Sequence, residues 1–377
     1  MKKPLSYIEI SRSALRNNID QFRRILPKGN LLVLVVKANA YGHGLKEVVK
    51  VAYPFVDAFQ VDDIEELRIA RAITDKKILV LGYIQTADLG ELVDLNGTLG
   101  CYNIETLKAL EKIGKKKNKK INIHLKIDAL LGRQGILISD LKDILNFLQR
   151  AKHVALESIY SHFSNIEDTN DLEHAQKQFE YLMNAKKVVT DFGFKDVRHH
   201  ISATSGLLSD MKNNWGGVLV RLGIGGYGLW PSKGLQKRLS KKIKLIPILR
   251  WISSVAQIKN IPKDFPVGYG LTYVTKKSTK IAVVSQGYSD GYDRGFSNNS
   301  FVLIKGMKCP VLGRIAMNMF VAEVSNIKDV KLEDEVILLG NQNKTEISAE
   351  ILAQKVSTIN YEIVARLNPL IPRVIVK

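Results

Sequence analysis

The feature that most constrains the fold is a strand-like segment followed by a helix-like segment, repeated eight times in the first two-thirds of the chain. Short aliphatic runs alternate with segments whose apolar residues are spaced for one face of a helix. Such strands pair in parallel, and eight units in about 220 residues are typical of a (β/α)8 TIM barrel. An open, doubly wound sheet is the alternative, because periodicity does not reveal closure. The predicted strands are 31–36, 58–61, 78–81, 99–102, 121–127, 156–160, 199–202 and 218–221.

The character of the sequence changes after about Lys233. Strand-like runs then follow one another without helices between them, and one helix is predicted near the end. We therefore expect an α/β barrel domain at 1–235 and a mostly β C-terminal domain at 236–377, with the first ~8 residues as a candidate for pairing with the second domain. The basic stretch 233–244 is the expected linker. The strands of the second domain are predicted at 247–258, 280–285, 301–304 and 335–339, and its helix at about 348–356.

Charge and composition indicate which kinds of partner and which compartment to expect. Lys and Arg number 56 against 37 Asp and Glu, a formal net charge of +19, which raises the question of a nucleic-acid partner. The basic clusters at 115–120 and 237–244 lack the interleaved aromatic residues that stack on bases, so we interpret them as solvated surface and expect no nucleic acid. The longest aliphatic run, 31–36, is far shorter than the ~20 residues of a membrane span. Two cysteines and no secretory apolar stretch favour the cytoplasm.

Reactive side chains gather where the predicted strands end, which is the edge of a barrel that carries active sites. Lys37 directly follows the first aliphatic strand. An unpaired ammonium is costly to bury, so such a lysine is expected to have a lowered pKa or to form a covalent bond, as Schiff-base chemistry requires. A lysine whose head reaches water at a strand end fits the position equally well. The other candidates at strand ends and in the following loops are Lys126, Asp128, Arg133, His162, Ser205 and Arg221.

The loops after the seventh and eighth strands suit a phosphate group. Ser205 lies in the first and Gly223-Ile224-Gly225-Gly226 in the second, and barrels commonly bind phosphate there through hydroxyls and backbone N–H groups. A lysine and a phosphate site on one rim predict pyridoxal phosphate. The glycines formally match a dinucleotide motif, but Trp230-Pro231 follows instead of a helix, so we reject that interpretation. The seven histidines show no metal-ligand spacing, and no metal is expected.

Motifs along nearly the whole chain resemble those of the bacterial alanine racemases, the fold-type III enzymes that depend on pyridoxal 5'-phosphate. The segment from Val35 to Gly44, VVKANAYGHG, is similar to that family's cofactor-attachment motif. The resemblance implies a barrel with a β-rich second domain, and a homodimer whose active sites take residues from both chains. Further matches occur, in the family's order, at 132–135, 161–163, 221–224, 269–273, 287–291, 313–318 and 358–362.

The resemblance implies a role for each matching residue. Lys37 would hold the cofactor and act as one catalytic base, and Tyr269 from the partner chain would be the second, on the opposite face of the α-carbon. A phenol has a pKa near 10, so a neighbouring cation must lower it, and Arg133 is the candidate. In the remaining assignments, Tyr41, Ser205, Gly223, Ile224 and Tyr361 hold the cofactor phosphate, His162 orients Arg221 at the pyridine nitrogen, and Arg133, Met317 and Tyr288 bind the amino-acid substrate.

Several positions depart from the family pattern. Ala129-Leu130-Leu131 replaces a small, glycine-containing stretch, Asn318 stands where aspartate is usual, and Ala316 where cysteine is common. Lys126 aligns with a lysine that is often carbamylated, and Gly268 replaces a common serine and is expected only to loosen its loop.

We expect an alanine racemase, an isomerase that interconverts L-alanine and D-alanine and supplies D-alanine for peptidoglycan. A broader-specificity or serine-preferring amino-acid racemase of the same fold is the alternative. A barrel that binds pyridoxal phosphate without catalysis is a different class, which lacks the β domain and a counterpart of Tyr269.

Overall fold

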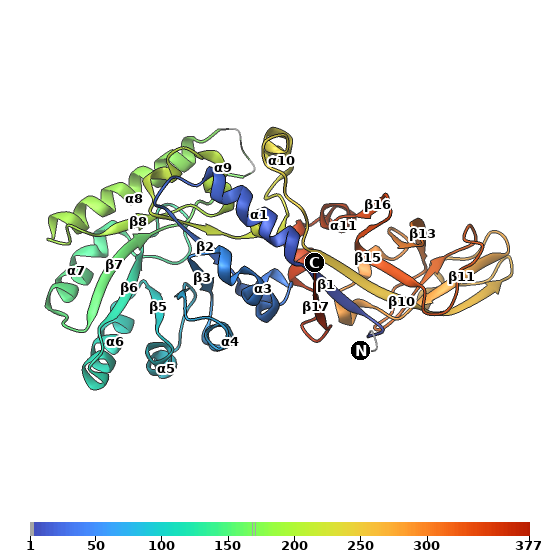
Figure 1. Ribbon diagram of the computed structural model, residues 1–377, viewed down its shortest axis with the longest axis horizontal. Coiled ribbons are helices and arrows are strands. Elements are labelled where there is room, and N and C mark those ends of the chain that lie inside the picture. Colours follow the sequence, from blue (N-terminus) through green and yellow to red (C-terminus); the bar gives the residue numbers. More distant parts are fainter. Residues whose placement is uncertain (1–3, 168, 170) are drawn as a thin grey trace. The chain divides into compact units, whose positions relative to one another are not determined.

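The computed structural model describes residues 4–167, 169 and 171–377, and the chain divides into two compact units (Figure 1). The barrel unit consists of Ala14–Lys37 and Val49–Ile246. The β-rich unit consists of the residues up to Ser13, Ala38–Val48 and Pro247–Lys377. The division therefore falls directly after Lys37, so that the lysine motif has residues in both units.

The barrel unit is built on parallel strands, and its closure decides between the two predicted sheets. In the described part of the chain, eight strands form one sheet in the order β8-β7-β6-β5-β4-β3-β2-β9. The first strand, β2, pairs with the last, β9, and a bridge between Ala203 and Arg221 joins the segment after β8 to β9. The sheet closes, which confirms the barrel. The strands are β2 (Leu31–Val35), β3 (Ala58–Val61), β4 (Lys77–Val80), β5 (Gly97–Cys101), β6 (Ile121–Lys126), β7 (Val154–Tyr160), β8 (Arg198–His200) and β9 (Leu219–Leu222).

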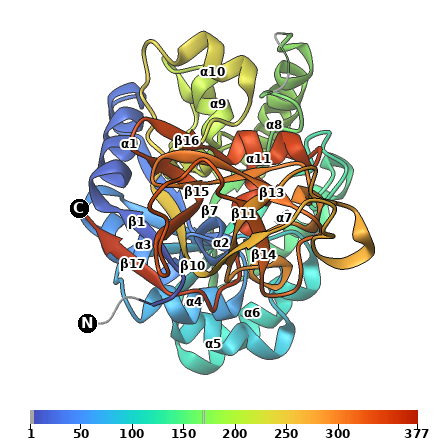
Figure 2. The ribbon, with the colours of Figure 1, turned by 90° about the vertical axis from the view of Figure 1, so that its right-hand side faces the viewer.

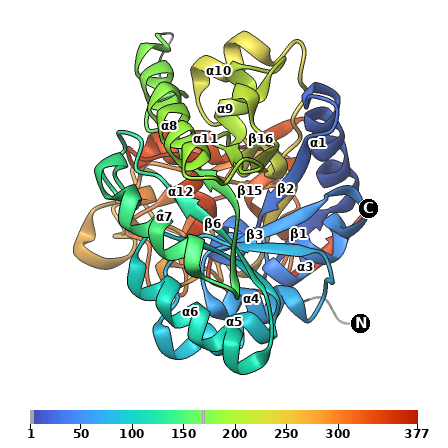
Figure 3. The ribbon, with the colours of Figure 1, turned by 90° about the vertical axis from the view of Figure 1, so that its left-hand side faces the viewer.

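Helices surround these strands (Figure 3), and side-chain caps fix where several begin. The Asp63 carboxylate accepts a hydrogen bond from the Glu66 amide at 2.8 Å at the start of α4, which satisfies one of the unpaired first-turn donors. The Ser232 hydroxyl caps α10 in the same way, so the predicted linker 233–244 is helical in its first half. The helices are α1 (Arg12–Ile25), α3 (Leu45–Ala52), α4 (Ile64–Arg71), α5 (Leu89–Asp94), α6 (Ile104–Lys117), α7 (Leu141–Arg150), α8 (Glu173–Asp191), α9 (Thr204–Ser209) and α10 (Lys233–Leu239).

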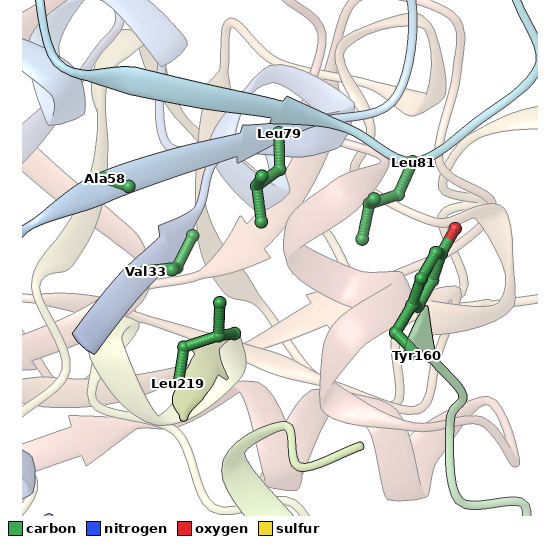
Figure 4. Packing of buried hydrophobic residues seen from close by; sticks show 6 residues of the cluster. All are labelled: Val33, Ala58, Leu79, Leu81, Tyr160 and Leu219. Atoms are coloured by element: carbon green, nitrogen blue, oxygen red, sulfur yellow. The ribbon is translucent and has the colours of Figure 1, made fainter. Parts of the chain in front are cut away.

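Aliphatic side chains fill the barrel, so it is a packed core rather than a channel (Figure 4). Each large apolar side chain buried in this way contributes about 1.5–3 kcal/mol relative to exposure. Gly100 leaves room for the ring of Tyr160, since a Cβ at this glycine would lie 2.3 Å from the tyrosine oxygen. The cluster consists of Val33, Ala58, Leu79, Leu81, Tyr160 and Leu219.

The β-rich unit contains a mixed sheet in the order β16-β15-β12-β13-β14-β11-β10-β1-β17 (Figure 2). The N-terminal strand β1 belongs to it, antiparallel to β10 and parallel to β17. Helix α11 (Ala349–Lys355) matches the predicted one, whereas α12 (Asn360–Ala365) was not predicted. The strands are β1 (Tyr7–Ser11), β10 (Leu249–Ile261), β11 (Thr279–Val284), β12 (Phe301–Ile304), β13 (Met307–Leu312), β14 (Phe320–Glu323), β15 (Glu335–Gln342), β16 (Thr345–Ile347) and β17 (Arg373–Val376). In the described residues, no helix is long and apolar enough to cross a membrane.

Candidate active site

The chain turns left-handed immediately after Lys37. Ala38, Asn39, Ala40 and Tyr41 have φ angles of 53°, 53°, 54° and 53°. A left-handed helical turn costs roughly 1–2 kcal/mol for each residue that carries a Cβ, and local propensity does not favour it in a sequence without glycine. Such strain persists only where surrounding contacts impose it, and it concentrates at functional sites.

Contacts within the β-rich unit hold this left-handed turn. The amides of Gly42 and Gly44 donate to the carbonyls of Ala38 and Asn39, both at 2.9 Å, and the Asn39 side chain accepts from the Leu45 amide at 2.9 Å. Gly42 has a φ of 78°, and a Cβ there would lie 1.8 Å from the Val364 carbonyl oxygen. Only glycine allows this backbone approach, so the glycine of the motif has a structural explanation.

The Lys37 amine is accessible and paired. Its side chain is 42% exposed, and Nζ lies 3.8 Å from a carboxylate oxygen of Asp62. Of the two interpretations of its position, the structure therefore favours a lysine whose head reaches water, because the side chain extends beyond the end of the aliphatic strand. Asp62, which was not predicted as a site residue, could have been found from the sequence, since it directly follows β3, the strand beside β2.

Arg221, on β9, is the most deeply anchored candidate. Its Nη2 donates to the carbonyls of Ser161 at 2.8 Å and Ile201 at 2.9 Å, and to Nδ1 of His162 at 3.3 Å. Its Nη1 donates to Nδ1 of His200. Burial lowers the pKa of Arg221 to about 10, so it stays protonated near neutrality. Within the described residues, its Nε and the second hydrogen of Nη1 have no acceptor, which leaves donors for a ligand.

His162 contacts Arg221 as the free base. Burial, followed by the nearby charge of Arg221, lowers the pKa of His162 to about 3. The ring is therefore neutral near pH 7, and its Nδ1 can accept the hydrogen bond from the guanidinium.

Lys126 lies at the end of β6 and is 5% exposed. Its Nζ donates to the side-chain oxygen of Gln134 at 3.0 Å. Burial, with the charges of Arg133 and Arg221 next, lowers the pKa of Lys126 to about 8. Lys126 is therefore a strand-end ammonium of lowered pKa.

Asp128 organises the loop that departs from the family pattern. Its carboxylate accepts hydrogen bonds from the backbone amides of Leu131 at 3.0 Å, Gly132 at 3.0 Å and Arg133 at 3.2 Å. Three backbone donors on one carboxylate fix the path of the loop. Asp128 therefore has a structural role in presenting Arg133.

The two predicted phosphate loops lie together. The Thr204 hydroxyl, at the start of α9, accepts from the amide of Gly223 at 3.1 Å and so links the loop after β8 to the loop after β9. Among the described residues, the Ile224 amide and the Ser205 hydroxyl have no hydrogen-bond partner. These donors are what an anion requires. Thr204 was not predicted, because a hydroxyl that joins two loops leaves no spacing signal.

The structure separates the tyrosines of the second domain. Tyr269 is 72% exposed and Tyr288 is 42% exposed. Tyr273 packs against the small core around Ile261, and Tyr292 is fully buried and stacks on Phe320. Two of the four tyrosines therefore pack in the core, and the other two are available for chemistry.

Glycines shape the loop that carries Tyr269. Gly268 has a φ of 75° and a ψ of −171°, a conformation that essentially only glycine adopts, so the expectation that it merely loosens the loop is wrong. A Cβ at Gly270 would lie 2.6 Å from a guanidinium nitrogen of Arg314. Arg314 was not predicted, and it places a cation against the backbone next to Tyr269.

The segment at Met317 is tied to the segment at Tyr288. The Tyr288 amide donates to the Ala316 carbonyl at 3.1 Å, and the Ser289 amide to the Met317 carbonyl at 3.1 Å. The Asn318 amide group donates to the Ser289 hydroxyl at 2.9 Å. A carboxylate cannot make this donation, so asparagine in place of aspartate has a local explanation.

The remaining predicted residues are Tyr41 and Tyr361, whose ring centroids lie 6.2 Å apart at an interplanar angle of 53°. The structure thus forms two groups of site residues. Lys37, Lys126, Arg133, His162, Ser205, Arg221, Gly223 and Ile224 belong to the barrel unit, and Tyr41, Tyr269, Tyr288, Met317 and Tyr361 to the β-rich unit. No cluster of three or more metal-ligating side chains occurs in the described part of the chain.

Acid is expected to destabilise the fold, because buried neutral histidines cannot easily gain a proton. Burial lowers the pKa of His162 to about 3 and of His43 to about 4, and that of His200 far below 6.5. In the unfolded chain these rings titrate near 6.5 and bind more protons, so the free energy of unfolding falls as the pH drops below 6.5. Each ring contributes up to ~1.4 kcal/mol per pH unit.

The midpoint of urea unfolding, measured at intervals from about pH 7.5 to about pH 5, should therefore fall steadily below pH 6.5. The variant His43→Gln should show a shallower fall, because it removes one of the buried rings. A midpoint that is unchanged over this interval would show that the folded chain gains protons as readily as the unfolded chain, so that the rings are not held neutral by burial.

Comparisons with known proteins agree along the whole chain. The family descriptions that match are "Alanine racemase, N-terminal domain" over residues 10–231 and "Alanine racemase, C-terminal domain" over residues 248–375. Alanine racemase 1 of Caldanaerobacter subterraneus is 34% identical across 97% of this chain and 94% of its own length. The alanine racemase of Leptospira interrogans is 34% identical across 98% and 96%. The crystal structure of alanine racemase from Bacillus anthracis with bound L-Ala-P has a TM-score of 0.93 at 29% identity, covering 100% of this chain and 96% of that chain.

Proposed function

The chain belongs to the alanine racemase family, and we propose that it interconverts L-alanine and D-alanine with pyridoxal 5'-phosphate held by Lys37. The observation that carries the proposal is the pairing of β2 with β9. This pairing brings the strand that precedes Lys37 next to the strand that carries the anchored Arg221, in a closed barrel.

The donors of the barrel rim fit this cofactor. The Ile224 amide and the Ser205 hydroxyl, unpaired among the described residues, match a phosphate, and Gly223, Tyr41 and Tyr361 complete the proposed set. The unpaired donors of Arg221 match a ring nitrogen that accepts a hydrogen bond. When bound, pyridoxal phosphate withdraws electrons from the α-carbon of an attached amino acid, which makes the α-proton removable.

In this proposal two residues move the proton. Lys37 removes or returns it on one face of the α-carbon, and Tyr269 of the partner subunit does so on the other. The 72% exposure of Tyr269 in a single chain supports a role in a second chain's site. Arg133 is proposed to lower the pKa of this phenol and, with Met317 and Tyr288, to hold the substrate carboxylate.

Arg221 is proposed to govern the ring nitrogen. Because its pKa of about 10 keeps it protonated near neutrality, it donates a hydrogen bond and does not supply a proton. A ring nitrogen without a proton is a weaker electron sink, which favours return of the α-proton over side reactions such as transamination. His162 holds the guanidinium from one side at 3.3 Å.

Lys126 is proposed to be carbamylated. Its pKa of about 8 leaves about a tenth of the amine neutral at pH 7, and the neutral amine is the form that reacts with carbon dioxide. Addition of ¹³C-bicarbonate should give a carbamate ¹³C resonance, and Lys126→Arg should abolish it while Lys108→Arg retains it. A wild-type protein without this resonance would contradict the modification.

We further propose a homodimer with shared active sites that works in the cytoplasm and supplies D-alanine for peptidoglycan. Two observations support it: Tyr269 and Tyr288 are exposed in the single chain, and the cysteines Cys101 and Cys309 are free and buried, as is usual in a reducing compartment.

The proposed activity is tested by incubating the purified protein and pyridoxal phosphate with L-alanine alone, followed by chiral separation. We expect equal amounts of both enantiomers at equilibrium. The same assay with L-serine separates strict alanine racemisation from the broader-specificity alternative. An incubation in which neither amino acid changes configuration would refute the proposal.

A further inference from the structure

A line of polar side chains runs through the barrel unit from Arg221 to a carboxylate. Nη1 of Arg221 contacts Nδ1 of His200 on β8. Nε2 of His200 lies 2.9 Å from Nδ1 of His124 on β6. Nε2 of His124 lies 3.6 Å from a carboxylate oxygen of Glu157 on β7. Both histidines are at least 98% buried. Two donors or two acceptors facing each other along this line would therefore destabilise the fold, because water cannot satisfy them there.

The chemistry of each group fixes the direction of these contacts. A guanidinium only donates hydrogen bonds, so Nδ1 of His200 must accept and the proton of this ring must be on Nε2. That proton is donated to His124, whose Nδ1 must therefore accept. The proton of His124 must then also be on Nε2, directed at the carboxylate of Glu157. The 3.6 Å separation exceeds an ordinary hydrogen bond, so the last contact is mainly electrostatic.

The surroundings keep the two rings neutral. Burial lowers the pKa of both His124 and His200. The ring of Tyr160 stacks on His200 at 5.1 Å with an interplanar angle of 8°, and Lys126 Nζ lies 5.9 Å from the Tyr160 ring centre. A proton added to Nδ1 of His200 would face the guanidinium and break the contact with Arg221. A proton added to Nδ1 of His124 would face Nε2–H of His200 and break the contact between the two rings.

Glu157 remains ionised at the end of this line. It also accepts hydrogen bonds from Lys77 and, at 2.8 Å, from Arg198. The contact with His124, together with the hydrogen bond from Lys77, lowers the pKa of Glu157 to about 2. Its charge is thus present at every pH at which the protein is expected to fold.

We propose that Glu157 is a positioning residue for Arg221: through His124 and His200 its carboxylate stabilises the one direction of contacts in which His200 presents an acceptor to the guanidinium. The remaining donors of Arg221 then stay available for the ring nitrogen of a cofactor. The inference rests on the proposed function only for the identity of that ligand, since the geometry of the line belongs to the chain alone.

The direct test is the protonation state of the two rings in the cofactor-free protein. With ¹⁵N-labelled histidine, long-range ¹H–¹⁵N correlation spectra at neutral pH should show His124 and His200 as neutral rings with the proton on Nε2. In Glu157→Gln, His124 should lose this strict preference, whereas in Lys77→Gln, which retains the carboxylate, both rings should keep it. A proton on Nδ1 of either ring in the wild type, or a charged ring, would overturn the proposal.

Two substitutions at His124 distinguish a role in directing hydrogen bonds from a role in packing. His124→Gln keeps an oxygen that can accept from His200 and an amide that can donate to Glu157, whereas His124→Leu keeps volume but neither function. We expect His124→Leu to weaken pyridoxal phosphate binding and to lower kcat about tenfold, the loss of one hydrogen bond to a charged group, with the KM for alanine little changed. His124→Gln should stay within about threefold of wild type.

Equal loss in both His124 variants would show a packing role and overturn the proposal. If His124→Leu does not fold, Glu157→Gln against Lys77→Gln provides the same comparison, with loss expected only in the former. A wild-type protein that binds no pyridoxal phosphate would refute the proposed function. The protonation states of His124 and His200 in the cofactor-free protein would still show whether the proposed series of contacts from Arg221 to Glu157 exists.

Discussion

Replacing Lys37 by alanine is expected to lower the rate of alanine racemisation by about 10⁴-fold or more, because the variant loses both the anchor of the cofactor and one of the two groups that move the proton. The visible absorbance that the wild type should show with pyridoxal phosphate should also disappear. The fold should be unaffected, since the Lys37 side chain is 42% exposed and its ion pair with Asp62, at 3.8 Å, is a surface pair that contributes about 1 kcal/mol at most.

A matched control is Lys46→Ala, which removes an exposed lysine from the same motif region, on α3. It should keep wild-type activity and absorbance. Chiral product analysis and circular dichroism on both variants separate chemistry from folding. If the Lys37→Ala protein keeps more than about a hundredth of the wild-type rate, Lys37 is not one of the two groups that move the proton.

Replacing Tyr269 by phenylalanine is expected to lower racemisation about 10²–10⁴-fold, the usual contribution of one acid–base group. The loss should be selective. Because Lys37 still removes and returns a proton on its own face, one enantiomer should exchange its α-hydrogen with deuterated solvent faster than it changes configuration. Proton NMR of alanine in D₂O together with chiral analysis measures both rates.

Tyr273→Phe is the control, because it removes a hydroxyl from the same loop on a ring that packs into the core around Ile261. It should leave both rates near those of wild type. Equal loss of exchange for both enantiomers in Tyr269→Phe would show that this tyrosine supports binding rather than one face of the reaction.

The barrel was predictable from the sequence because its strands are short aliphatic runs at regular spacing, and observed strands such as β3 and β7 lie within two residues of those expected. Closure was not predictable, since it depends on the pairing of β2 with β9, about 190 residues apart. Helix α12 was missed because its N-cap residue, Ile359, provides no side-chain hydrogen bond.

The candidate site was predictable where a residue stands at a strand end or in a recognisable motif, as Lys37 and Arg221 do. Partners that meet only through the fold were not. Asp62 at Lys37, Thr204 between the phosphate loops and Glu157 behind His124 follow from tertiary contacts between distant segments. The left-handed turn after Lys37 opposes the local preference of its residues, so tertiary packing overrides the sequence signal there.

The amine of Lys37 in one chain and the phenol of Tyr269 in another are proposed to serve the same α-carbon. This proposal is tested most directly by dissociating the two inactive variants, Lys37→Ala and Tyr269→Phe, mixing them in equal amounts and allowing them to reassociate. If sites are shared, half of the dimers are mixed and each has one intact site of two, so racemase activity should return to about a quarter of the wild-type value. Activity no greater than the sum of the separate variants, with mixed dimers shown to be present, would contradict the account.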